Sequence, residues 1–294
     1  MIPLSHPTVE RLLAIMDQKT HWAWPSFTRP GLSRAQLLIH FRHEYATYVR
    51  DFPVLLGSAL GQVPDLIDVR RSLAENIYEE QTGGLSKSAP HPELFLRMME
   101  GLGFARAQFE EQALDADLHP AASSSRDWLR DRSRALPWQT ATALLTIFVE
   151  GSVNERGELM GTYVRAKGEA AVMKHPMVVH YGCRPSAMHL VRAHGDVEGG
   201  HRGDAWRVIL DHTKDEAIAK QVVDTCIDGL ARWQRYRDGV AELMGIVRDH
   251  SITAAPPVVQ MSARKPSSEL VDCYGEAAWY GPPRQRCSSV ARSS

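Results

Sequence analysis

The segment His194-Gly195-Asp196-Val197-Glu198-Gly199-Gly200-His201 places three possible metal ligands at relative positions 0, 4 and 7. Successive residues of an α-helix are about 100° apart, so His194, Glu198 and His201 would lie within about 60° of one another, whereas Asp196 would point away. One helical face would then present two imidazoles and a carboxylate to the same small volume. Mixed nitrogen and oxygen ligands suit iron or manganese better than a structural zinc ion, which more often takes thiolates. The segment therefore predicts a metal site on a helix.

The same segment is rich in glycine, which weakens a helix by about 0.8 to 1.0 kcal/mol per residue relative to alanine. Two interpretations follow: the glycines let a neighbouring helix or a substrate approach closely, or the segment orders when a metal binds. A third interpretation is a polar surface helix whose two histidines share no role. Histidines at this spacing are weak evidence for a metal site unless further ligands are found elsewhere in the chain.

Composition limits the classes of function. The chain has 294 residues, 44% of them hydrophobic, which is enough for a substantial core, and its formal net charge is −1. A nearly neutral chain has no basic surface of the kind that drives non-specific binding to nucleic acid or anionic lipid. We therefore expect a small-molecule substrate, no nucleic-acid partner and no membrane partner.

The cysteines and the apolar runs predict a cytoplasmic protein. The four cysteines are widely spaced and form no Cys-x-x-Cys pair, which indicates neither a thiolate zinc site nor a disulfide framework. The N-terminus lacks the basic and apolar regions of a signal peptide. Nowhere does an uninterrupted apolar run reach the length of about 18 residues that a membrane-spanning helix needs.

Helical periodicity dominates, and neither a convincing period-two strand nor an internal repeat is evident, so we predict an all-α fold. Residues 1–250 form the predicted helical domain, and residues 251–294, rich in Pro, Ser and Arg, form a predicted irregular or partly disordered tail. Ser33-x-x-Gln36 is a capping box that opens a long helical stretch, which Pro53 kinks or restarts. We expect a loop over 22–31, a linker at 121–125, and helices over 7–17, 34–60, 63–81, 141–152, 160–167, from 184 through the central segment, 204–210 and 215–247.

Further ligand candidates lie at helix ends. Glu79 and Glu80 come shortly before Gly83-Gly84, and His91 follows after a polar loop, so a carboxylate and an imidazole are placed to converge. Exposed acids and a capping histidine are an equally good explanation of this stretch. Glu150 ends a strongly apolar run, where an ionised carboxylate costs several kcal/mol if it is buried without a partner. We expect Glu150 either to reach water or to bind a cation, and we favour the cation.

Glu44 is a weaker candidate. It lies between Phe41 and Tyr48 on the stretch that begins after Ser33, which allows an inward orientation. A solvated glutamate beside Arg42 and Arg50 is the interpretation that we favour for it.

Collected together, the candidates are three carboxylates and three imidazoles from separate helical regions: Glu80, His91, Glu150, His194, Glu198 and His201. This number of ligands suffices for two iron ions in a helical bundle, with positions left open for oxygen. A ferritin-like site needs two Glu-x-x-His motifs, and only Glu198-x-x-His201 has that spacing. The ferritin-like fold is therefore disfavoured.

The sequence resembles the haem-oxygenase-like diiron oxidases, relatives of the pyrroloquinoline-quinone synthase and thiaminase II folds. The resemblance covers residues from about 35 to 210. It is carried by the following pieces: Tyr48-Val49-Arg50-Asp51-Phe52-Pro53, Asn76-x-x-x-Glu80 followed by His91, Glu150, His180-Tyr181-Gly182, and His194-x-x-x-Glu198-x-x-His201 with Trp206 beyond it.

This resemblance implies a haem-oxygenase-like helical bundle in which the six candidates hold two iron ions, cycling between Fe(II) and Fe(III), with O2 as co-substrate. The choice of Glu80 over Glu79 comes from the resemblance, and a contact of Glu79 or Glu44 with the metal stays open. The family commonly has Asp at the position of Glu198, whose longer side chain should still ligate but can change the iron spacing. The resemblance also implies a helix that orders when iron binds, and a homodimer.

Members of that family oxidise small amines, amino acids or fatty acids by N-oxygenation, oxidative decarboxylation or carbon–carbon cleavage. The resemblance thus implies a biosynthetic, O2-dependent oxidoreductase that acts on a small amino-acid-derived or carboxylate substrate, with no catalytic residue beyond the metal ligands. We treat Arg165 and Lys167 as exposed cations outside the site.

Two alternatives stay open. A cofactor-independent oxidase or a thiaminase-like hydrolase on the same fold would not need six ligands, and the hydrolase would want a nucleophilic thiol from Cys183 or Cys226. A non-catalytic helical protein, or a haem-binding protein with one axial histidine, would leave the three carboxylates unexplained.

Overall fold

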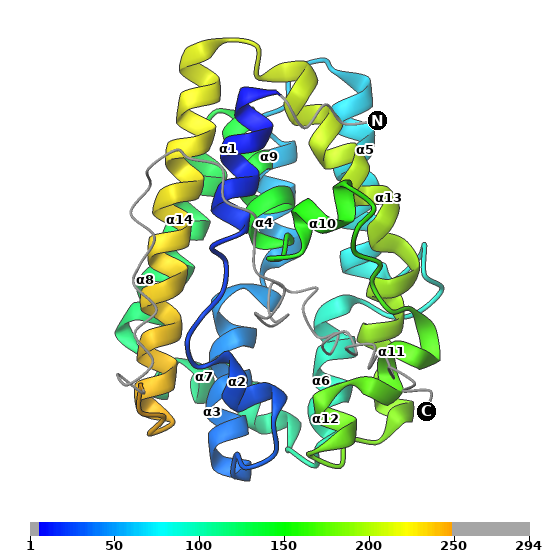
Figure 1. Ribbon diagram of the computed structural model, residues 1–294, viewed down its shortest axis with the longest axis vertical. Helices are drawn as coiled ribbons and strands as arrows, with labels where there is room; N and C mark the ends of the chain where they lie inside the picture. The colour runs from blue at the N-terminus through cyan, green and yellow to red at the C-terminus, as the bar shows by residue number, and fades with distance from the viewer. Residues whose placement is uncertain (1–5, 249–294) are drawn as a thin grey trace, which may run out of the picture.

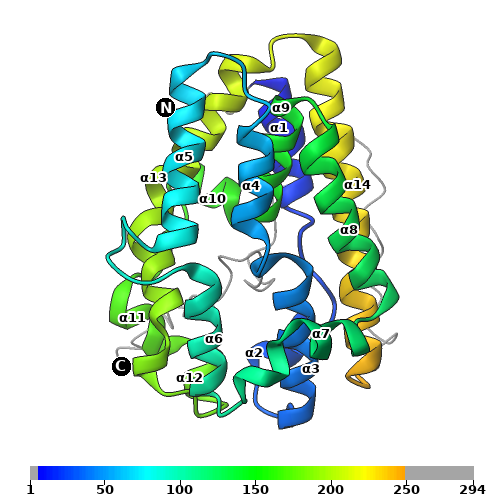
Figure 2. The same ribbon diagram turned by 180° about the vertical axis from the view of Figure 1, so that it is seen from behind.

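The computed structural model describes residues 6–248, except for the side chains of residues 196–202. Within this range every regular element is helical, as predicted (Figures 1 and 2). The α-helices are α1 Pro7–Met16, α2 Trp24–Thr28, α3 Arg34–Glu44, α4 Phe52–Leu60, α5 Ile67–Thr82, α6 His91–Gly101, α7 Glu111–Asp117, α8 Pro120–Ala135, α9 Trp138–Ala143, α10 Glu155–Leu159, α11 Gly168–Lys174, α12 Pro176–Val179, α13 His189–His212 and α14 Glu216–Leu243. Two π-helical segments, η1 Tyr45–Val49 and η3 Leu144–Val149, and two 3-10 segments, η2 Arg106–Phe109 and η4 Pro185–Ala187, complete the set.

The long helices set the shape of the bundle. In Figures 1 and 2, α14 runs along one side with α8 beside it, and α13 runs along the other side with α5 beside it. Between these pairs, α9 and η3 pack against both α13 and α14. The apolar run that was predicted as a helix over 141–152 thus lies at the centre, and every residue of η3 is buried.

The predicted capping box and the break near Pro53 are both confirmed. The Ser33 hydroxyl accepts from the Gln36 N–H at 3.2 Å, and the Gln36 side-chain oxygen accepts from the Ser33 N–H at 2.8 Å. From this start α3 passes into η1, and the chain begins again as α4 at Phe52.

The two π-helical segments adjoin carboxylates. Glu44 immediately precedes η1, and Glu150 immediately follows η3. A π-helical turn holds one more residue than an α-helical turn, and such segments occur frequently at functional sites. The position of both carboxylates beside π-helical segments is therefore typical of functional residues.

Several local predictions are wrong. Residues 121–125 form no linker, since α8 runs through them with Ala122 and Ser125 buried, and packing outweighs the weak helix propensity of serine. Residues 160–167 are irregular because the chain turns at Gly161, whose φ is 68°. The central helix begins at His189 rather than at residue 184, after the separate turn η4, and continues through 204–210 without a break.

Two smaller differences concern helix content and burial. The short helix α2 lies inside the predicted loop over 22–31. Ile227, which the spacing of apolar residues places in the core, is 50% exposed.

The predicted domain boundary at residue 250 and the predicted tail lie outside the described residues. Among the helices that the structure describes, none is long and apolar enough to cross a membrane.

His175, between α11 and α12, should make stability depend on pH. Its ring is fully buried, and Nδ1 accepts from the Met177 N–H at 3.2 Å. Burial lowers the pKa of His175 from 6.5 to about 3. Between these values the unfolded chain binds a proton that the folded protein excludes, so stability falls as pH falls, by up to about 1.4 kcal/mol per pH unit.

We expect His175→Asn, which keeps a side-chain acceptor for the N–H of Met177, to lose less stability than the wild-type protein as the pH falls through this window. Urea unfolding at a series of pH values measures the difference. Parallel pH profiles for the two proteins would contradict the assignment.

Candidate metal centre

Three of the six predicted ligands line one cavity between α5, α6 and α13. Glu80 lies in the last turn of α5, His91 is the first residue of α6, and His194 lies on α13. Glu44 from α3 also lines this cavity. The sequence-based expectation that a carboxylate at the end of one helix meets an imidazole across the following loop is confirmed.

His91 lies between two carboxylates. Its Nδ1 is 2.8 Å from Glu80 Oε1, and its Nε2 is 3.2 Å from Glu79 Oε1. Burial by itself would lower the pKa of His91, but the charges of Glu80 and Glu79 raise it to about 10. In the absence of another cation the imidazolium form therefore balances these carboxylates.

His194 faces His91, with ring centroids 4.9 Å apart and planes at 66°. It is 8% exposed. Burial lowers the pKa of His194 well below its ordinary value, and the positive charges of His91 and Arg165 lower it further. The ring is thus neutral at physiological pH, which is the form that can donate a lone pair to a metal.

Glu79, whose role the sequence left open, ties down the loop between α5 and α6. Its carboxylate accepts from the backbone N–H groups of Leu85 at 2.8 Å and Ser86 at 3.0 Å, and from the Ser86 hydroxyl. Burial raises the pKa of Glu79, but His91 and these donors outweigh it and bring the pKa to about 2. The loop begins at Gly83, where φ is 64° and a Cβ atom would lie 2.5 Å from the Ala89 carbonyl oxygen, so a residue without a side chain is required there.

Glu150 is connected to the same region through Asn76. Asn76 lies one turn before Glu80 on α5, is 5% exposed, and donates from Nδ2 to Glu150 Oε1 at 2.7 Å. This bond joins the end of η3 to the helix that carries Glu80. Asn76 was singled out only as part of the family resemblance, and its spacing in the sequence does not reveal the partner 74 residues away.

The side chains of Glu198 and His201 lie outside the described residues. The backbone of α13 is helical throughout His189–His212, as the same-face argument for these two residues and His194 requires. Their approach to the cavity stays a prediction.

Glu44 is not the solvated residue that we favoured. It is 1% exposed, and both of its oxygens have partners: Tyr48 Oη donates to Oε1 at 2.5 Å, and His40 Nε2 lies 2.9 Å from Oε2. Arg237 from α14, itself 3% exposed, donates from Nη2 to Oε1 at 3.4 Å and to Tyr48 Oη at 3.0 Å. Burial raises the pKa of Glu44, but Arg237 and His40 outweigh it and bring the pKa to about 2.

The cations expected beside Glu44 have other partners. Arg42 pairs with Asp117, and Arg50 pairs with Asp51. No local signal points to Arg237 as the partner of Glu44, since 193 residues separate them.

Arg165 also differs from expectation. Its side chain is 10% exposed rather than free in solvent, and it pairs with Glu158 through Nη2 at 2.6 Å. Its positive charge adds to burial and to His91 in lowering the pKa of His194.

The described side chains include two that are suited to bind a metal ion, but they do not form a complete set of ligands. Among the side chains that the structure describes, no three His, Cys, Asp or Glu residues are arranged so as to hold a metal ion. The described pair, His91 Nδ1 and Glu80 Oε1, nevertheless has the chemistry of two ligands, because Glu79 occupies the other ring nitrogen. A histidine that binds a metal almost always donates its second N–H to a carboxylate, a carbonyl or a water.

Comparison with known families supports iron in this protein. Residues 39–234 match the model of a family described as iron-containing redox enzymes. The chain belongs to this family. The match confirms the predicted kinship and the general assignment to an iron-containing redox family. All six predicted ligands lie within the matched range, and their role stays a prediction.

The fold has a solved counterpart. The crystal structure of a TenA homologue from Pseudomonas syringae pv. tomato str. DC3000 is similar with a TM-score of 0.60 and 14% sequence identity, covering 82% of this chain and 97% of that chain. At this identity the likeness concerns the fold, and the predicted haem-oxygenase-like helical bundle is confirmed. Comparison with curated protein sequences found no match.

Proposed function

We propose that this member of the iron-containing redox family is a diiron, O2-dependent oxygenase or oxidase. Its substrate is a small amino-acid-derived or carboxylate compound, which it converts by N-oxygenation or oxidative carbon–carbon cleavage. Glu80, His91, Glu150, His194, Glu198 and His201 hold the two iron ions. The observation that carries the proposal is the placement of His91 between two glutamates of the same helix end.

In this arrangement the two glutamates have different tasks. Glu79 accepts from Nε2 of His91 and so sets the orientation of the ring. Nδ1 then faces Glu80, and both residues line the same cavity as His194. In the metal-free protein, the protonated ring of His91 neutralises part of the negative charge of Glu79 and Glu80. A metal cation bound there would replace that proton.

Other residues orient the remaining ligands and keep the site dry. Asn76 fixes one oxygen of Glu150. The buried side chains of Val49, Phe95 and Leu190 line the cavity and limit access of bulk water. When bound, iron supplies the electrons that activate O2, and the chain supplies the ligands, the orientation and the exclusion of water.

The thiaminase-like alternative finds less support in the cysteines. Burial raises the pKa of Cys183 to about 11 and the pKa of Cys226 to about 12. Neither residue is then a thiolate at neutral pH, and the thiolate is the form that attacks a substrate. The other two cysteines lie outside the described residues.

Anaerobic titration of the metal-free protein with Fe(II) tests the proposal. We expect uptake of two iron ions per chain, followed on exposure to O2 by a transient visible absorption and by oxygen consumption. Consumption should accelerate with one compound among small amines, amino acids and fatty acids. Absence of stoichiometric iron uptake would count against the diiron assignment, and a Soret band in the purified protein would favour a haem-binding role instead.

A further inference from the structure

Lys19 is a buried cation with three main-chain partners. It follows α1 in the sequence and is 2% exposed. Its Nζ donates to the carbonyl oxygens of Phe148 at 2.5 Å, Val149 at 2.9 Å and Gly151 at 2.7 Å. The same Nζ lies 4.9 Å from the centroid of the Phe148 ring. A lysine is almost never fully buried unless its charge is compensated, and these oxygens compensate it.

The three carbonyls lie on both sides of Glu150. The Glu150 N–H donates to the Leu145 carbonyl at 3.1 Å and closes the last π-helical turn of η3. The chain then leaves the helix at Gly151, so the final carbonyls lack the donors that a continued helix would provide. The Lys19 ammonium takes their place, and the negative end of a helix dipole favours a cation there.

We propose that Lys19 is a positioning residue for Glu150. Its three hydrogen bonds hold the main chain before and after this predicted ligand, while Asn76 holds the carboxylate itself. The backbone and the side chain of Glu150 are thus restrained by two different residues, Lys19 after α1 and Asn76 on α5. The inference rests on the proposed function in one respect, namely that Glu150 binds iron.

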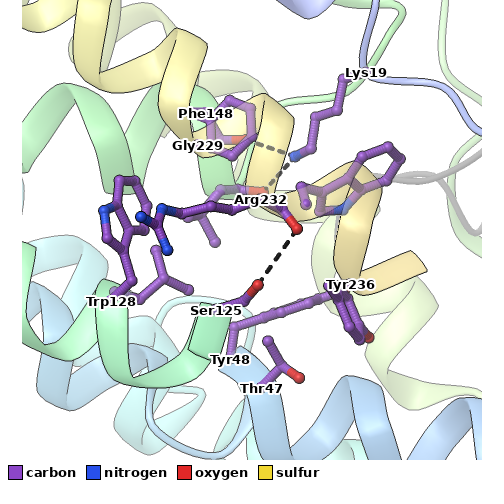
Figure 3. Close-up of a pocket in the computed structure, with 12 residues that line it drawn as sticks. Lys19, Thr47, Tyr48, Ser125, Trp128, Phe148, Gly229, Arg232 and Tyr236 are labelled. Atoms are coloured by element: carbon purple, nitrogen blue, oxygen red, sulfur yellow. Dashed lines mark hydrogen bonds between the residues drawn. The ribbon is translucent and has the colours of Figure 1, made fainter. Parts of the chain in front are cut away.

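A pocket lies directly against Lys19, as Figure 3 shows. It lies between α8, α14 and the two π-helical segments, and the rings of Tyr48, Trp128 and Trp233 form much of its wall. Shortening Lys19 to alanine removes a group equivalent to propylammonium. An added n-propylammonium ion matches the removed group in size and charge, which makes rescue by an added amine an informative experiment.

The test is the anaerobic Fe(II) titration on the wild-type protein, Lys19→Ala and Lys19→Arg. We expect Lys19→Ala to lower the apparent affinity for one of the two iron ions by about 10- to 100-fold, the range found when groups that orient metal ligands are removed. The Mössbauer signal of that iron should change as well. Lys19→Arg should retain most of the affinity. Added n-propylammonium should restore the affinity of Lys19→Ala, whereas n-propanol, of similar size but uncharged, should not.

Arg34→Met serves as the matched control. Arg34 also caps helix-end carbonyls, since its Nη1 donates to the Leu102 carbonyl at 2.8 Å beyond the end of α6. We expect this variant to lose stability while binding both irons as the wild-type protein does. If Lys19→Ala fails to fold, Lys19→Met, which keeps the apolar stem of the side chain, is used for the same titration.

The outcomes separate the two proposals. Loss of thermal stability in the Lys19 variants with wild-type affinity for both irons would overturn the positioning role and leave the diiron assignment intact. Rescue of Lys19→Ala by n-propanol as effectively as by n-propylammonium would also overturn it, because space-filling rather than charge would be responsible. If the wild-type protein takes up no iron, the proposed function fails and the role of Lys19 fails with it.

Discussion

Replacing Glu80 with glutamine should reduce iron uptake from two ions to at most one per chain, whereas the same replacement of Glu79 should leave both ions bound with about 10-fold weaker affinity. Glu80 Oε1 lies 2.8 Å from His91 Nδ1 on the wall of the cavity. Glu79 instead holds Nε2 of the same ring and the backbone N–H groups of the following loop. The variants make identical chemical changes at adjacent positions, so each is the control for the other.

Anaerobic Fe(II) titration with analysis of bound iron measures this difference, and urea unfolding of the metal-free variants shows whether either change has disturbed the fold. Loss of iron from the Glu79 variant alone would exchange the roles of the two residues. Full uptake by both variants would mean that this cavity is not the iron site, even if iron binds elsewhere in the chain.

Replacing Arg237 with methionine should lower the free energy of unfolding by about 3 to 5 kcal/mol. The substitution removes the buried cation that faces Glu44 and leaves the carboxylate ionised in an apolar interior. It also removes the guanidinium that lies over the rings of Trp24 at 4.6 Å and Tyr236 at 4.7 Å. Urea unfolding at neutral pH measures the loss.

The double variant Arg237→Met with Glu44→Gln should recover part of this loss, because a neutral amide no longer needs the cation and can still accept from Tyr48. As a control, Lys220→Met breaks an ion pair with Asp224 on the exposed face of α14 and should change stability by less than about 1 kcal/mol. If Arg237→Met and Lys220→Met lower the free energy of unfolding equally, the buried pair of Arg237 and Glu44 contributes no more to stability than the surface pair of Lys220 and Asp224.

Glu44 and its buried partners show that the charges nearest to a residue in the sequence do not always become its partners in the structure. From the sequence, Arg42 and Arg50 are the near cations, and a solvated glutamate between them is a reasonable expectation. The side chain turns inward because His40 and Tyr48, one turn away on either side, offer polar groups on the buried face, and α14 brings Arg237 to the same point. The first two partners were visible in the sequence, and the third was not.

Local chemistry by itself determined much of this protein. Apolar periodicity predicted the all-α fold, the Ser33-x-x-Gln36 spacing predicted the start of α3, and the short polar loop before His91 predicted that its imidazole converges with a carboxylate at the end of the preceding helix. These features depend on hydrogen bonds and side-chain spacing between residues that are close together in the sequence, so the sequence alone is enough to predict them. Where such signals were weak, as at residues 121–125, packing against distant helices decided the outcome.

Only the tertiary structure decided which polar side chains and carbonyl groups from distant parts of the sequence form hydrogen bonds or ion pairs with one another. The bonds from Asn76 to Glu150, from Arg237 to Glu44 and from Lys19 to the end of η3 join residues 74, 193 and about 130 positions apart. Each satisfies a charge or a carbonyl that burial has removed from water, and its partner is whichever polar group the packing of the helices brings within reach. The sequence supplies the donors and acceptors, but their pairing depends on how the helices pack.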